Sequence, residues 1–201
     1  MKNKKAVVIM AYGSPENISD LDGYLQDIFG KNPVPPDARA DNLKKYSLFG
    51  NRSPSNHILA SLKRKVEQKL SQSDIDVYLS FKHWYPSLKE TAEVIANVNY
   101  SEIVELPLFP FPSEGVFNSY FIPFSEELKA RNFKGRRHVI NGFYKHPGFL
   151  EIWSSRIKDM IENGQYDRLL LTAMFKKTAD SYVKEFAEYA AHYFSQHNNF
   201  V

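Results

Sequence analysis

The sequence contains no cysteine. Disulfides, thiolate metal sites, cysteine nucleophiles and cysteine-ligated iron–sulfur clusters are therefore excluded. It also has no apolar run near the ~18 residues that a membrane-spanning helix requires. The short apolar run after the basic residues 1–5 is not followed by a small-residue cleavage site, so it is not typical of a signal peptide. We therefore expect a cytoplasmic protein without a transmembrane segment.

Glycine is scarce, at 9 residues, and no phosphate-binding glycine loop or Gly-x-Ser-x-Gly element is present. This argues against an ordinary dinucleotide site and against serine hydrolysis. The 6 histidines are scattered without His-Glu-x-x-His spacing, so a multi-histidine metal site is not expected. The net charge of +3 favours anionic partners such as carboxylates but is too small to indicate nucleic acid. The basic pairs 136–137 and 176–177 are expected to be solvated.

What is present is an alternation of two patterns. Apolar, β-branched runs predict strands, and they cover residues 5–11, 75–81, 103–109, 137–140 and 168–172. Amphipathic stripes predict helices between them, with Pro123 expected to bend or restart one of these helices. Residues 31–56 are expected to form a loop with one helical turn near residues 43–46. The alternation predicts one α/β domain over residues 1–201, with a mostly parallel sheet of four to five strands and helices on both faces.

Four of the predicted strands end in short polar or proline-bearing segments. These segments are residues 12–15, 82–86, 110–113 and 174–177. In a parallel sheet all four would gather at the carboxyl edge, which is where open α/β sheets bind ligands. Together they carry tyrosines, a Lys-His pair, prolines and aromatic rings but almost no carboxylates. We infer a lining that suits a flat, apolar ligand.

Each of these segments also has a simpler interpretation. Tyr12 either presents its ring to a ligand or packs in an ordinary turn. His83 can titrate near neutral pH beside Lys82, but taken alone it is more often a strand-end histidine bonded to the backbone. Ser53 is predicted as a helix N-cap with Pro54 at the first helical position, although free N–H groups there also suit a carboxylate.

In this order, the segments resemble the N-terminal domain of ferrochelatase, and most of all the Gram-positive type that inserts iron into coproporphyrin III. The matching stretches are residues 8–15, 45–54, 81–83, 110–113, 119–120 and 144–156, the last reading Tyr-x-x-Pro-x-Phe-x-x-x-Trp-x-x-Arg. The likeness runs over residues 5–194. Each motif alone is weak, but six in register are specific.

The resemblance implies a chelatase fold, Rossmann-like, that binds a tetrapyrrole of haem biosynthesis. Tyr12 would approach the centre of the macrocycle as an axial-type metal ligand, and His83 is the candidate base on the cleft floor. The other residues that the resemblance places at the porphyrin or its propionates are Ser14, Lys45, Tyr46, Ser53, Lys82, Tyr120 and Met174. No cofactor is required; porphyrin or haem is the ligand, and Fe²⁺ is the candidate substrate.

The chain departs from the family pattern in three ways. The family places its catalytic histidine in an Ala-His-Ser-Leu-Pro motif, but residues 173–177 here read Ala-Met-Phe-Lys-Lys, and the thioether of Met174 is no base. The family's arginines near Phe29 and Gly30 are absent. The likeness also stops before the family's second domain, which supplies the other cleft wall and an acidic residue. We therefore expect impaired iron insertion by this chain alone.

Two alternatives stay open at this point. The chain could be an active iron chelatase completed by a homodimer or a partner chain, with His83 as the remaining base. It could also be a non-catalytic protein-interaction domain that kept the fold and lost the ligand.

Overall fold

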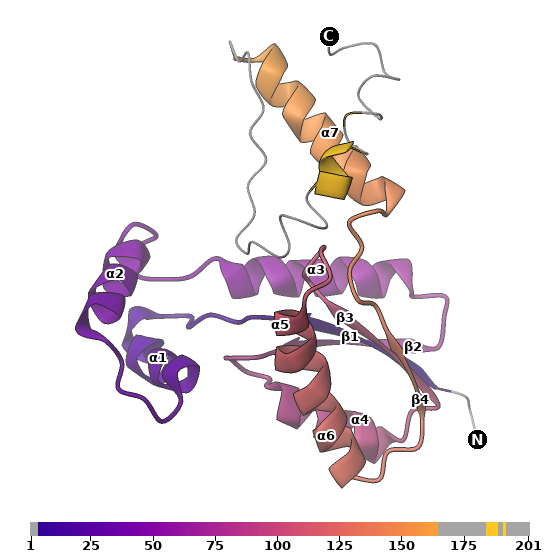
Figure 1. Ribbon diagram of the computed structural model, residues 1–201. Helices are drawn as coiled ribbons and strands as arrows, with labels where there is room; N and C mark the ends of the chain where they lie inside the picture. Colours follow the sequence, from indigo (N-terminus) through magenta and orange to yellow (C-terminus); the bar gives the residue numbers. More distant parts are fainter. Residues whose placement is uncertain (1–3, 165–183, 189–190, 192–201) are drawn as a thin grey trace. The chain divides into compact units, whose positions relative to one another are not determined.

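The computed structural model describes residues 4–164, 184–188 and 191, which form two compact units (Figure 1). The first unit comprises the described residues of Met1–Leu108 and Asn118–Ile140. The second comprises those of Phe109–Phe117 and Asn141–Val201. The sheet and the segments 12–15 and 82–86 at its carboxyl edge belong to the first unit.

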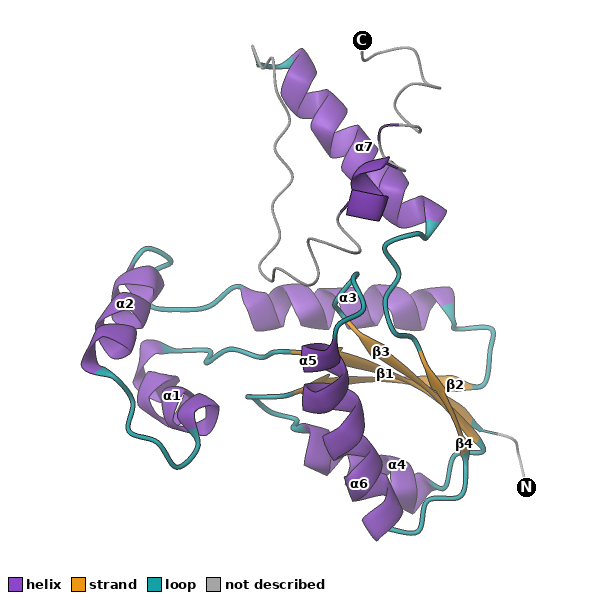
Figure 2. Ribbon diagram, viewed as in Figure 1, coloured by secondary structure: helices purple, strands orange, loops and turns teal. Residues whose placement is uncertain are grey.

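The first unit is built on one sheet of four parallel strands (Figure 2). The strands are β1 (Lys5–Ala11), β2 (Ile75–Phe81), β3 (Glu102–Pro107) and β4 (Arg136–Val139), and their order across the sheet is β2-β1-β3-β4. The predicted parallel α/β sheet is thus confirmed, with β1 and β2 at the predicted bounds. The predicted strand at residues 168–172 lies outside the described residues.

Helices cover both faces of this sheet (Figure 1). Helix α3 packs against the sheet from one side, whereas α4 and α6 pack against each other on the opposite side. The helical elements of the first unit are η1 (Ile18–Asp20), α1 (Leu21–Phe29), α2 (Pro36–Ser47), α3 (Ser55–Lys69), α4 (Leu88–Val98) and α6 (Ile122–Ala130). The predicted arrangement of helices on both faces is therefore confirmed.

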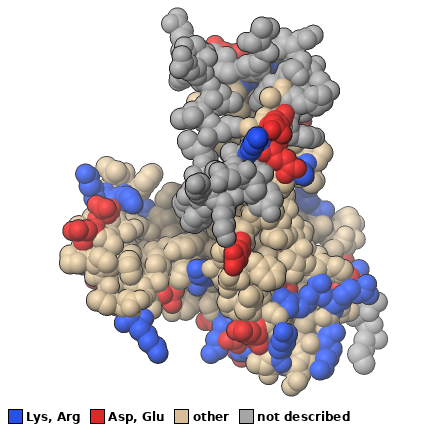
Figure 3. Space-filling view, viewed as in Figure 1, with Lys and Arg blue, Asp and Glu red and all other residues tan. Residues whose placement is uncertain are grey.

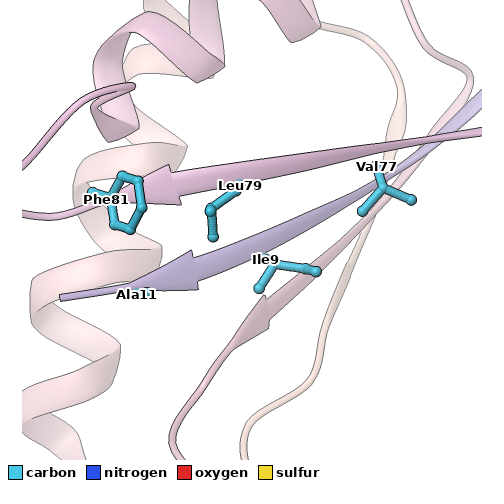
Figure 4. Close-up of a cluster of buried hydrophobic side chains, with 5 residues drawn as sticks. All are labelled: Ile9, Ala11, Val77, Leu79 and Phe81. Carbon is cyan, nitrogen blue, oxygen red and sulfur yellow. The ribbon is translucent and has the colours of Figure 1, made fainter. Parts of the chain in front are cut away.

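The core follows from the period-two pattern of the strands. Five side chains of β1 and β2 point to the same face and form a buried cluster, shown in Figure 4: Ile9, Ala11, Val77, Leu79 and Phe81. Leu59, Val66 and Leu70, from α3 and its C-cap, pack against this cluster. The alternate residues Val8 and Met10 are fully buried on the other face. Strand β1 is covered on both faces because it is central, which explains its nearly continuous apolar sequence.

Helix α2 corrects the prediction of a loop over residues 31–56, which was wrong for this part of the segment. Pro36 stands in its first turn beside Asp37, and Lys44 lies in its last turn, so the helix carries the expected end signals. None of its residues is buried. Without an apolar stripe, the periodicity that predicts the other helices is missing here.

The aromatic-rich residues 117–128, around Pro123, do not form one continuous α-helix. A short helix, α5 (Glu114–Val116), leads into a π-helical turn, η2 (Phe117–Phe121), and α6 begins immediately after it. Pro123 lies in the first turn of α6, so the expectation that proline restarts the helix is confirmed. Single π turns inside helices are frequent at functional sites, and this one carries Tyr120.

A buried ion pair ties β4 to β3. The carboxylate of Glu105 is fully buried, and Arg137 donates to it through Nε at 2.6 Å and Nη2 at 2.9 Å. Arg137 also donates to the hydroxyl of Ser125 on α6. The expectation that both arginines of the pair 136–137 are solvated was therefore wrong for Arg137. Arg137 is directed toward the interior because the buried carboxylate of Glu105 needs a partner of opposite charge.

The second unit contains α7 (Pro147–Glu162) and a cluster of aromatic rings. Tyr144 and Leu150 are buried with Phe186, and the ring centroids of Phe111 and Tyr144 lie 5.3 Å apart. The Tyr144 hydroxyl donates to the carboxylate of Glu185 at 2.6 Å. Both the segment 110–113 and the motif over residues 144–156 thus contribute to one aromatic core.

Acidic and basic side chains lie next to one another over β4 and α6 on the face shown in Figure 3. Two ion pairs of this part of the chain join Arg136 to Glu102 and Arg131 to Glu127. Of the helices in the described part of the chain, none has both the length and the apolar character needed to cross a membrane.

Candidate functional site

The exits of β1 and β2 place two predicted site residues side by side. The parallel ladder continues past the ends of the strands, because Lys82 N donates to Ala11 O and His83 N donates to Tyr12 O, each at 2.9 Å. Residues that follow paired ends of parallel strands leave the sheet at the same edge. Tyr12 and His83 therefore emerge together at the carboxyl edge.

The side chains at these exits are in contact. The ring centroids of Tyr12 and His83 lie 4.8 Å apart, with the planes tilted by 58°. The Nζ atom of Lys82 lies 5.8 Å from the centroid of the Tyr12 ring, which is within the range of a cation–π contact. Tyr12 is 42% exposed, so its ring is open to a ligand while it packs on the imidazole.

Gly13 explains how the two exits come so close. Its φ is +89°, and a Cβ at this position would lie 2.6 Å from the Cβ of Trp84 and 3.2 Å from that of Phe81. Tyr24 of α1 donates to the carbonyl of Gly13 at 3.1 Å, and its ring meets Trp84 edge-on. Only a residue without a side chain fits between the exits, so glycine at this position fixes the spacing of Tyr12 and His83.

A carboxylate that the sequence analysis missed completes this group. Asp27 of α1 places Oδ2 2.6 Å from Nδ1 of His83. The His83 side chain is only 11% exposed, whereas that of Asp27 is 59% exposed. The only signal in the sequence is that Asp27 stands three residues after Tyr24, on the same side of a helix.

Hydroxyl and amide groups form a second cluster next to the β1 exit. The Ser14 and Ser53 hydroxyl oxygens lie 2.9 Å apart, and Ser14 Oγ donates to Asn56 Oδ1 at 3.2 Å. Asn56 Nδ2 donates in turn to the Ser14 carbonyl at 2.6 Å. The phenol of Tyr46 lies close enough to Ser53 and Ser14 for both hydroxyls to lower its pKa. Ser14, Tyr46 and Ser53, predicted as binding residues, are therefore brought together, and Asn56 is an addition.

The start of α3 positions this cluster. The helix begins at Ser55 with Pro54 as its N-cap, so the prediction of Ser53 as N-cap was wrong by one residue. Ser53 Oγ nevertheless accepts a hydrogen bond from the Ser55 amide at 3.2 Å. Lys45 is exposed in the last turn of α2, one residue before Tyr46.

Burial keeps the phenols at this edge neutral. It raises the pKa of Tyr12, and the charge of Asp27 raises it further. Burial is also the main cause of the raised pKa of Tyr120, to which Tyr12 adds. The pKa of Tyr46 is raised by burial although its bonds to the serines lower it. Each phenol therefore keeps its proton at neutral pH and can donate it in a hydrogen bond.

The edge thus combines a pair of rings in tilted contact, one lysine and a group of neutral donors. In the part of the chain that the structure describes, no group of three or more His, Cys, Asp or Glu side chains gathers to form a metal site. The chemistry that the residues do offer is stacking of a flat ring and hydrogen bonding or ion pairing with carboxylates.

Comparison with known proteins decides the family. A family model for ferrochelatase matches residues 4–198. The chain belongs to the ferrochelatase family. Similar members include the ferrochelatase of Thermoplasma acidophilum, 42% identical over 156 residues (78% of this chain and 50% of the relative). The ferrochelatase of Thermoplasma volcanium is 40% identical over 157 residues (78% and 51%). The coproporphyrin III ferrochelatase of Oceanobacillus iheyensis is 27% identical over 180 residues (86% and 57%).

The chain spans about half the length of these ferrochelatases. The resemblance stated from the motifs alone is confirmed over nearly all of the sequence. Met174 and the segment 174–177, where the family motif is altered, lie outside the described residues. The segment 110–113 belongs to the second unit and is described with it.

Proposed function

We propose that this ferrochelatase-family chain binds a porphyrin or haem at the carboxyl edge of its sheet, on the side of Tyr12 and His83. The observation that carries the proposal is the contact between these two rings, with Lys82 beside them and the serine hydroxyls next to the same strand exit. Family membership supports a tetrapyrrole as the flat ligand.

The aromatic pair at the strand exits and the nearby hydroxyl cluster suit two different parts of the ligand. The macrocycle is apolar and planar, so it would lie over the Tyr12 ring. Its propionates would be held by Lys82 and Lys45 and by the hydroxyl group of Ser14, Tyr46 and Ser53, since ionised acceptors form the stronger hydrogen bonds. Tyr120, which is buried, would face the ligand only through its support of the wall. This division predicts that the acidic side chains of the porphyrin matter for affinity.

We further propose that iron insertion by this chain alone is impaired. Met174 stands where the family pattern has its catalytic histidine, and a thioether cannot accept the pyrrole protons that metal insertion removes. Loss of a positioned general base costs about 10²–10⁴-fold in rate. Tyr12 would approach the metal as a neutral phenol, which is a weak ligand until it loses its proton. The chain needs no resident cofactor in this account, and Fe²⁺ is its substrate where insertion occurs.

An absorbance titration with metal-free coproporphyrin III tests the binding proposal. We expect a saturable shift of the Soret band, weakened by Tyr12→Ala and unchanged by the control Tyr78→Phe, which removes a hydroxyl that bonds to Tyr100 instead. Ser53→Ala should weaken coproporphyrin III binding more than binding of its tetraester. Absence of any spectral change would contradict the proposal and leave a protein-interaction domain as the better account.

The pair of His83 and Asp27 favours a second candidate function. A histidine held by a carboxylate is a suitable base, so the chain could insert iron when a second copy or a partner chain supplies the other wall. The test is formation of metalloporphyrin from coproporphyrin III and Fe²⁺ at increasing protein concentration. A parallel series adds the portion of the Thermoplasma acidophilum relative that this chain does not cover. Turnover in neither series would eliminate this candidate.

A further inference from the structure

Helix α1 reaches both strand exits from one side. Tyr24 and Asp27 stand three residues apart, so they share a face of the helix. Tyr24 donates to the carbonyl of Gly13 at the β1 exit, and Asp27 contacts His83 at the β2 exit. The helix therefore holds the backbone of one exit and the side chain of the other.

The bond between Asp27 and His83 has only one proton arrangement when the imidazole is neutral. An ionised carboxylate accepts hydrogen bonds and cannot donate, so Nδ1 must carry the proton. The lone pair then lies on Nε2. Free imidazole side chains prefer the opposite tautomer, with the proton on Nε2, so this contact imposes a choice that the residue would not make unaided.

The surroundings of His83 hold the ring in this orientation. Its side chain is 11% exposed, and the Tyr12 ring packs on it at 4.8 Å from the β1 exit. Charged or titratable groups near it include Asp27 from α1, Tyr12 just after β1 and the adjacent Lys82, whose Nζ lies over the Tyr12 ring. Asp27 is the group among these that bonds to the imidazole.

We propose that Asp27 is a positioning residue that fixes His83 in its Nδ1–H tautomer and so leaves Nε2 able to accept a proton from the bound macrocycle. The role toward the macrocycle rests on the second candidate function, iron insertion completed by a second copy or a partner chain. Each Fe²⁺ that enters replaces two pyrrole protons by bonds from nitrogen to iron, without a change of oxidation state. Nε2 would take these protons one at a time and release each to water.

Nitrogen-15 NMR of the histidine side chains in the complete chain tests the tautomer directly. Spectra are recorded at a pH where the imidazole is neutral, and His83→Gln assigns the signal. Hydrogen bonds to charged groups are strong enough to favour one tautomer by about tenfold or more. We therefore expect His83 to be at least about tenfold enriched in the Nδ1–H form, and Asp27→Ala to abolish this preference.

Two further variants separate positioning from a general effect on the structure. Asp27→Glu keeps the carboxylate and should recover part of the preference. Asp22→Asn breaks an exposed ion pair with Arg39 on the same helix and should leave the His83 signal unchanged. Because Asp27 is more than half exposed, the Asp27→Ala chain should fold, which circular dichroism checks.

An Nε2–H tautomer in the unaltered protein, or an unchanged tautomer ratio in folded Asp27→Ala, would overturn the proposal. The measurement needs no porphyrin, so its failure is distinct from failure of the binding proposal, which the absorbance titration decides.

Discussion

Replacing Gly13 by alanine perturbs the point where the β1 and β2 exits meet. The new Cβ would lie 2.6 Å from the Cβ of Trp84, closer than real Cβ contacts allow, and 3.0 Å from its backbone nitrogen, which is a tight contact. A left-handed backbone conformation costs an L-residue about 1–2 kcal/mol. Overpacking a filled site adds about 1–3 kcal/mol. We therefore expect Gly13→Ala to lower the free energy of unfolding by about 2–5 kcal/mol.

Urea unfolding with a matched control separates the two contributions. Gly50 also has a positive φ, +66°, but a Cβ there would meet nothing within 4 Å. Gly50→Ala should therefore cost only the conformational part, about 1–2 kcal/mol. If the two variants lose the same free energy, Trp84 does not crowd Gly13, and the reasoning that fixes Tyr12 beside His83 is refuted.

Three other predictions concern the first unit. Arg137→Met leaves the buried Glu105 carboxylate without its partner and should lower the free energy of unfolding in urea by about 3–5 kcal/mol. The control Arg136→Met, at an exposed residue, should change it by less than about 0.5 kcal/mol. Equal losses in the two variants would contradict the buried pair. Tyr24→Phe removes the bond to the Gly13 carbonyl and should cost about 1 kcal/mol, and no loss would mean that this bond is not formed. Because burial raises the pKa of Tyr24 in the folded state, the unfolded chain releases the phenol proton first, near pH ~10. Stability should be complete below that pH and fall as the pH rises further, with a shallower fall in Tyr24→Phe; a rise of stability above pH ~10 would contradict the sign.

The strands and their common edge could be predicted because buried strands leave a recognisable apolar pattern in the sequence. Strand β1 is covered on both faces, so its apolar run is nearly continuous, and the parallel pairing of β1 and β2 brings Tyr12 and His83 together without further information. Helix α2 could not be found in this way, since it buries no residue and has no apolar stripe.

The partners of the site residues could not be predicted from periodicity. Asp27 is an exposed carboxylate on the polar side of α1, and only the distance from that helix to the β2 exit makes it a partner of His83. Arg137 gave the same difficulty. In the sequence it is one of two adjacent basic residues, which is typical of a solvated surface. Only the structure shows that β3 places the buried carboxylate of Glu105 opposite it.

Proton NMR during a titration with metal-free coproporphyrin III tests the central claim most directly, because the ring current of the macrocycle shifts the protons that lie over it. The account predicts large, saturable shifts of the Tyr12 and His83 ring protons and no comparable shift for Tyr78 or Tyr100, whose hydroxyls bond to each other away from this edge. Shifts at Tyr78 and Tyr100 with none at Tyr12 and His83 would show that the ligand binds elsewhere and would contradict the account.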